Sequence, residues 1–75
     1  MDDRNKQKMI EMLQENEYAL QVAYGNKEHD VFLFRVGLAQ GMFNAITRMG
    51  YSVNCTHDRQ PNGYVATTYN DIKEV

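Results

Sequence analysis

The most informative part of the chain is DVFLFRVGLAQGMFNAITRMG, residues 30 to 50. Asp30 is a residue type that caps the start of a helix, while Arg48 and Gly50 suit a helix end. At 100° per residue, its apolar side chains spread over roughly 220° of the helix surface, well beyond the stripe of about 100° on an ordinary surface helix. We therefore predict a single helix that begins after Asp30, ends before Gly50 and must be covered on more than one side.

The chain before this stretch predicts another helix, from Asp2 or Asp3 to about Tyr24. Acidic residues suit a helix start, and Gly25 suits a left-handed residue just past the helix end. A helical wheel divides the side chains into a core side and a solvent side. The core side holds Met9, Leu13, Asn16, Leu20, Ala23 and Tyr24. The solvent side holds Gln7, Glu11, Gln14, Glu15 and Tyr18.

Two segments leave an alternative for this half of the chain. Residues 18–24, YALQVAY, show the alternation of a strand, and residues 31–36, VFLFRV, are rich in strand formers. Paired as a hairpin, they would give an N-terminal helix followed by a ββαββ arrangement, whose helix would begin near Gly37. The capping residues at both ends of the central stretch favour two helices instead.

The C-terminal third of the chain predicts a β-hairpin. Residues 51–58 alternate as a strand does, RQPNG supplies turn residues, and residues from about 63 to 70 return with strand formers. The remaining residues, 70–75, are expected to fray, with Ile72 docking on the core. The predicted fold is thus α+β, with two antiparallel helices followed by a C-terminal β-hairpin.

Two glycines inside the central helix need an explanation, because each weakens a helix by about 1 kcal/mol relative to alanine. Gly37, Gly41 and Ala45 recur every four residues and form a stripe of minimal side chains, flanked by Leu38 and Met42. Such a stripe lets another backbone approach closely: the first helix, the hairpin, a second copy of the chain, or a ligand or nucleic-acid backbone. Because a short chain has little with which to cover a wide apolar arc, we expect a homodimer whose seam includes this helix.

Composition places the chain among ordinary folded proteins. Its 75 residues form one domain with a thin core, 43% of them are hydrophobic, and the formal net charge is −2. A lone cysteine, Cys55, is unusual for a small secreted domain, and the charged start MDDRNKQKMIEML lacks the apolar run of a signal peptide. No segment approaches the roughly 18 apolar residues that a membrane span needs. We therefore expect a cytoplasmic protein.

No motif in the chain predicts catalysis, a cofactor or a metal site. Cys55, His57 and Asp58 lie close together, but a structural zinc site needs four ligands and only His29 is left to add. Cys55 and His57 would share one face of a strand, with no third group in view to orient the histidine. GLAQGM lacks the Lys-Ser/Thr of a phosphate loop and lies within a helix. We expect a non-enzymatic protein without a small-molecule substrate.

Nucleic-acid binding is the alternative function. The hairpin region could gather a basic and aromatic patch from Arg48, Arg59 and Tyr64, joined by Lys73, Tyr51 and Tyr69. Aromatic rings stack on single-stranded bases. Eight basic residues against ten acidic ones, however, give no general attraction for phosphate, on which non-specific affinity for nucleic acid largely depends. Nucleic acid is therefore the less favoured partner.

The central stretch also carries a resemblance. The run DVFLFRVGLAQGMFNAITRMGYSV, residues 30–53, resembles the D-x-F…R-x-G-x-x-x-G…A…G-Y-x-V pattern of very small, mostly uncharacterised proteins of phages and prophages of Gram-positive bacteria. The pattern is matched at Asp30, Phe32, Arg35, Gly37, Gly41, Ala45, Gly50, Tyr51 and Val53. This resemblance implies an accessory role in a bacterial cytoplasm, such as binding and adjusting a host or phage protein. We therefore interpret the chain as a protein-interaction or regulatory module.

Overall fold

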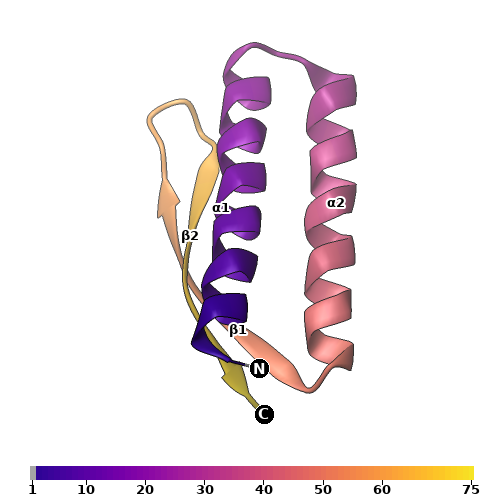
Figure 1. The fold of residues 1–75 in the computed structure, drawn as a ribbon. Coiled ribbons are helices and arrows are strands. Elements are labelled where there is room, and N and C mark those ends of the chain that lie inside the picture. The colour runs from indigo at the N-terminus through magenta and orange to yellow at the C-terminus, as the bar shows by residue number, and fades with distance from the viewer. Residues whose placement is uncertain (1) are drawn as a thin grey trace.

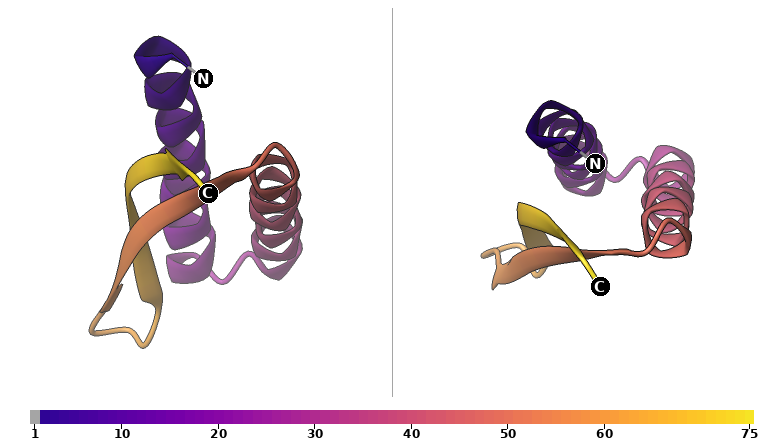
Figure 2. Two further views of the ribbon diagram at one scale, coloured as in Figure 1. Left: turned by 90° about the horizontal axis from the view of Figure 1, so that it is seen from below. Right: turned by 60° about the horizontal axis from the view of Figure 1, so that its bottom comes forward.

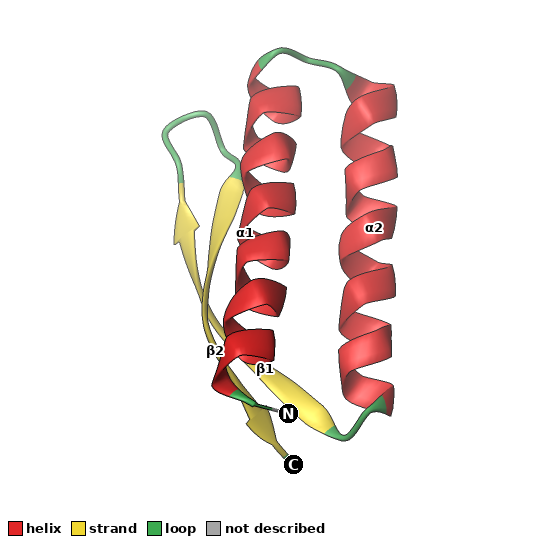
Figure 3. Cartoon of the chain, viewed as in Figure 1, coloured by secondary structure: helices red, strands yellow, loops and turns green. Residues whose placement is uncertain are grey.

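The computed structural model describes residues 2–75 and consists of two helices followed by two strands (Figure 1). The four elements are helix α1 (Asp3–Gly25), helix α2 (His29–Arg48), strand β1 (Tyr51–Arg59) and strand β2 (Val65–Glu74). The helices lie side by side and antiparallel, and the strands form an antiparallel hairpin (Figure 3). The predicted α+β fold, two antiparallel helices followed by a C-terminal β-hairpin, is confirmed.

Both segments that favoured a strand lie inside helices, so the ββαββ alternative is wrong. Residues 18–24 contribute Leu20 and Ala23 to the buried side of α1, and residues 31–36 form the first turns of α2. Preferences for β structure span only about 1 kcal/mol and depend on the surroundings. Packing of the two helices against each other and the hairpin therefore outweighs them.

The loop between the helices departs from the prediction at both of its ends. Gly25 is the last residue of α1, and the left-handed residue is Lys27, with a φ of 58°. The amides of Lys27 and Glu28 donate back to carbonyls in the last turn of α1, as in a Schellman motif. Glu28 occupies the cap position of α2, and Asp30 lies in the first turn, where a negative charge faces the positive end of the helix dipole.

The other two helix ends follow the prediction. At the start of α1, the Asp2 carboxylate accepts a hydrogen bond of 2.8 Å from the Asn5 amide. Just beyond α2, Gly50 has a φ of 88°, a conformation that glycine adopts without steric cost. Gly50 thereby turns the chain out of α2 and into β1.

The hairpin extends further than the sequence predicted. β2 continues to Glu74, and the amide of Val75 donates to the carbonyl of Gly50 over 2.9 Å. The predicted fraying of residues 70–75 is therefore wrong. Ile72 docks on the core as predicted and is fully buried, which anchors the C-terminal part of β2.

The core lies between the helix pair and the inner face of the hairpin (Figure 2). Its buried members are Leu13, Ile46, Tyr69 and Ile72. Partly buried and exposed residues alternate along β1, so the outer face of the hairpin is polar, with exposed Ser52, Asn54 and Thr56. The hairpin therefore buries one face only, which is the usual arrangement for an antiparallel sheet on a helix layer.

Side chains of α1 occupy the edge of β2 that is not paired with β1. The Gln14 amide group donates to the Thr67 carbonyl (3.2 Å) and accepts from the Tyr69 amide (3.0 Å). Glu17 is 2% exposed, and its carboxylate accepts from the Thr67 amide (2.8 Å) and from the Tyr64 hydroxyl (2.7 and 2.8 Å). The prediction that Gln14 faces solvent is wrong. These contacts fix a two-stranded sheet, which would be marginal alone, to α1.

Candidate interaction surface

One side of α2 is exposed along the length of the helix. Phe34 is 63% exposed and Leu38 is 40% exposed, and Val31 and Met49 near the two helix ends are exposed as well. These residues follow a spacing of three and four together with Gly41 and Ala45, so they form one continuous stripe. We call this stripe the outer face of α2 and define it as Val31, Phe34, Leu38, Gly41, Ala45 and Met49.

The outer face is left uncovered because α2 stands at the edge of the molecule. Figure 2 shows the hairpin beneath α1, whereas α2 meets the hairpin mainly through β1, which follows it in the chain. Within α2, all of which the structure describes, Ile46 is the one buried residue, whereas α1 buries five. The sequence predicted that α2 must be covered on more than one side, whereas the rest of a single chain covers only one side of this helix.

The two glycines of α2 lie in open space. A Cβ atom built on Gly37 or Gly41 would meet no other atom within 4 Å outside the local helix backbone. Neither α1 nor the hairpin therefore lies against these glycines, and close packing within one chain, which the sequence allowed, is not their explanation. An approaching backbone would have to come from another molecule.

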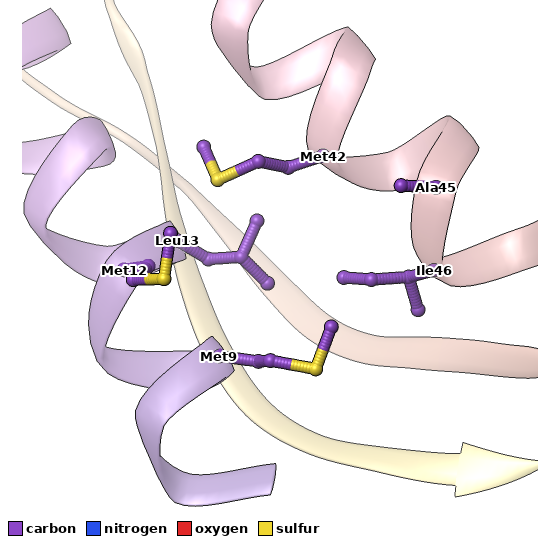
Figure 4. Close-up of a pocket in the computed structure, with 6 residues that line it drawn as sticks. All are labelled: Met9, Met12, Leu13, Met42, Ala45 and Ile46. Carbon is purple, nitrogen blue, oxygen red and sulfur yellow. The ribbon is translucent and has the colours of Figure 1, made fainter. Parts of the chain in front are cut away.

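An apolar cavity of about 90 Å³ lies between α1 and α2, beside the outer face (Figure 4). It is lined by Met9, Met12, Leu13, Met42, Ala45 and Ile46. Leu13 and Ile46 are buried, whereas Met12 is exposed, so the lining runs from the core to the surface. Methionine side chains are flexible and fill irregular gaps, so this flank of the outer face can adapt to a partner.

A polar contact sets the position of α2 against α1. Asn16 Nδ2 donates to the Arg35 carbonyl (3.0 Å), and Arg35 Nη1 donates to Asn16 Oδ1 (3.4 Å). Leu38 and Met42 line a groove beside this contact. The predicted seam residues, Gly37, Gly41, Ala45, Leu38 and Met42, therefore all lie on the outer face or directly beside it.

The structure separates the predicted nucleic-acid contacts. Arg48 ends α2 and Arg59 ends β1, whose nine residues span roughly 30 Å at about 3.3 Å each. Tyr64 packs with Tyr24 and Phe32, at ring-centroid distances of 5.1 and 6.2 Å. Burial, then the hydrogen bond to the carboxylate on α1, raise the pKa of the Tyr64 hydroxyl above its usual range. Arg48, Arg59 and Tyr64 therefore do not form one patch.

Cys55 and His57 lie together on β1, and β2 supplies the third group that the sequence did not reveal. His57 Nδ1 is 3.1 Å from Thr67 Oγ1, while Cys55 Sγ is 3.9 Å from His57 Nε2. The second distance exceeds the about 2.6–3.2 Å expected between a nucleophile and its base. Across residues 2–75, no three His, Cys, Asp or Glu side chains are grouped so as to hold a metal ion. The outer face of α2 is therefore the candidate site.

Comparisons of the chain with protein-family models, with curated proteins and with solved structures found no match. In the part of the chain from residue 2 to residue 75, neither helix has the length and apolar character to cross a membrane.

Proposed function

We propose that the protein is a small non-enzymatic protein-interaction module, with a regulatory role in the bacterial cytoplasm, and that it docks its partner on the outer face of α2. The observation that carries the proposal is the exposure of Phe34, Leu38 and Met49 along one continuous side of a helix. Single exposed apolar side chains need no explanation, whereas a continuous apolar stripe commonly marks an interaction site.

The shape of the outer face suits another helix as the docking element. α2 has 20 residues and is about 30 Å long. Side chains spaced three and four apart pack into the grooves of a facing helix. The missing side chain at Gly41 lets that helix approach closely, and Met12 and Met42 at the flank can adjust to its side chains.

The resemblance at residues 30–53 supports an accessory role in which a phage or prophage protein adjusts a host or phage protein by binding to it. A module of this kind acts by occupying or reshaping the surface of its partner. The contacts of Asn16 with Arg35 contribute by holding α2 in place, so that the outer face is presented on a fixed support.

Affinity capture tests the proposal. The tagged chain is incubated with the lysate of a Gram-positive bacterium that also expresses an untagged copy of the chain, in parallel samples with and without nuclease. We expect captured protein to be lost when Phe34→Glu or Leu38→Glu places a charge on the outer face, because burying an unpaired charge is costly. Gln40→Glu is the matched control, since Gln40 is exposed on another side of α2.

The control variant should retain whatever the unsubstituted chain captures. Because Phe34 and Leu38 are exposed, circular dichroism of both outer-face variants should remain that of the folded chain. Capture that is the same in all variants would contradict the proposal. Capture that disappears on nuclease treatment alone would favour the nucleic-acid alternative.

A further inference from the structure

We infer that the outer face of α2 binds the same face of a second copy of the chain, with the two α2 helices antiparallel and crossing near Ala39. The inference rests on the proposed function, since it names the partner of the same surface. A two-fold axis beside Ala39 places each residue of α2 level with the residue of the second copy that lies equally far on the other side of Ala39.

The charges of α2 complement the same helix reversed. Asp30 and Arg48 are 18 residues apart (48 − 30), about five turns at 3.6 residues per turn, so they project from the same side of the helix. Each lies nine residues from Ala39, so an antiparallel pair sets Asp30 of each copy level with Arg48 of the other. A parallel pair would instead set like charges side by side.

Both charged side chains are available for such pairing. Asp30 and Arg48 are exposed, and within residues 2–75 neither side chain takes part in an ion pair or a hydrogen bond. Asp30 lies one turn before Phe34, and Arg48 lies one turn after Ala45, so the two charges flank the apolar stripe at its opposite ends. Opposite charges placed in this way fix orientation and register, which an apolar stripe alone does not.

Side-chain size is complementary in the same register. Equal distances from Ala39 bring Gly37 level with Gly41 of the other copy, where the backbones can approach closely. Phe34 comes level with Asn44 of the other copy, so on the stripe its large ring lies between Gly41 and Ala45, which carry the smallest side chains. The space over Gly37 and Gly41 is open in the single chain, so it can receive this ring.

The size of the outer face sets the expected strength of association. A helix stripe of about 30 by 10 Å is smaller than the roughly 800 Å² that each partner buries in a standard interface. We therefore expect a reversible dimer whose population depends on protein concentration in the micromolar range.

Sedimentation velocity of the full chain, from low to high micromolar concentration, tests the inference. The sedimentation coefficient should rise from that of a monomer to that of a dimer. Phe34→Glu should weaken dimerisation at least about tenfold, because it brings an unpaired charge into the interface. Gln40→Glu, away from the outer face, should leave the dimerisation constant unchanged.

Charge reversal tests the antiparallel register. Asp30→Arg and Arg48→Asp should each weaken the dimer severalfold, because each sets like charges level with one another. The double variant should restore the dimerisation constant to within about twofold, because the pairs are re-formed with their signs exchanged. In a parallel dimer the single variants would not weaken association, and that result would overturn the inference.

The outcomes separate the inference from the proposed function. A chain that remains monomeric at high micromolar concentration overturns the inference, and if lysate proteins are still captured through the outer face, the proposed function stands with a different protein as partner. If the chain neither dimerises nor captures lysate proteins through the outer face, both the inference and the proposed function are overturned. A dimer that Phe34→Glu does not weaken also overturns the inference, because its interface must lie elsewhere, for example along the edge of β1 that is not paired with β2.

Discussion

At the scale of single residues, substitutions at Gly41 distinguish an effect on the stability of a single chain from an effect on its association with a second copy. Its added Cβ would meet nothing within 4 Å, so a larger residue removes the helix penalty of glycine without a clash. We expect Gly41→Ala to raise the free energy of unfolding by up to about 1 kcal/mol. Gly41→Leu should raise the free energy of unfolding as well. Urea unfolding at low micromolar concentration, where we expect the chain to be monomeric, measures both.

The matched control adds the same methyl group at Gly50, a glycine with a positive φ. Gly50 has a φ of 88°, so Gly50→Ala should lower the free energy of unfolding by about 1 to 2 kcal/mol, through backbone strain. If Gly41→Ala also lowered the stability of the monomer, another part of the chain would have to lie against Gly41. That result would contradict the open position of the glycine.

Local chemistry predicted some helix caps and not others. Asp2 and Gly50 were predicted correctly, because each has one capping residue type next to a clear helix end. The loop between the helices offers several capping residues within a few positions, and long-range packing selects among them. Tyr24 and Phe32 pack across this loop with their ring centroids 5.9 Å apart, and Lys27, not Gly25, takes the left-handed position.

At the scale of elements, the Glu17 carboxylate of α1 holds the start of β2 by binding the hydroxyl of Tyr64, the residue just before the strand. The Tyr64 hydroxyl donates to both oxygens of Glu17, which is buried. We expect Tyr64→Phe to lower the free energy of unfolding at neutral pH by about 1 to 3 kcal/mol, because a hydrogen bond to a buried charge is lost. Tyr18→Phe is the control, since Tyr18 is 69% exposed and its change should stay within about 0.5 kcal/mol.

The same contact makes stability depend on pH on the alkaline side. Burial raises the pKa of Tyr69 to about 12, and burial with the hydrogen bond to Glu17 raises the pKa of Tyr64 as well. The unfolded chain releases these protons near pH 10, so the stabilisation is complete below about pH 10 and is lost as the pH rises through the folded-state pKa values. The difference between the unsubstituted chain and Tyr64→Phe should therefore stay constant up to about pH 10 and narrow as the pH rises above it; a difference that stays constant above about pH 10 would contradict the assignment.

The sequence predicted the elements themselves but missed how α1 and β2 join. Periodicity located both helices and the hairpin, because burial of one side of each element leaves a repeating pattern. Glu17 was not expected in the interior, although it lies four residues after Leu13 and three before Leu20, on the same side of α1. That spacing was the signal in the sequence that could have placed Glu17 in the interior. Gln14 and Glu17 bind backbone atoms of β2, and a backbone leaves no trace in the residue types of its strand.

At the scale of the whole molecule, the sequence showed that α2 is too apolar but not which side stays open. The predicted arc included Phe34, Leu38 and Met49 together with Ile46, which is the buried one. The division depends on where α1 and the hairpin lie, and this is a property of the assembled fold. The glycines were singled out from sequence as a place where another backbone could approach, whereas their position in open space follows only from the packing of the other elements.

The distribution of charge over the whole molecule disfavours binding to nucleic acid. The net charge is −2, Arg48 ends α2 before β1 begins, Arg59 lies at the far end of β1, and the Tyr64 ring is packed against α1 and α2. We expect no retardation of single- or double-stranded DNA in a gel-shift assay at moderate salt, and no difference between the unsubstituted chain and Arg48→Ala. Micromolar binding whose affinity falls steeply with added salt would contradict this expectation, because that slope counts the phosphates that the protein neutralises.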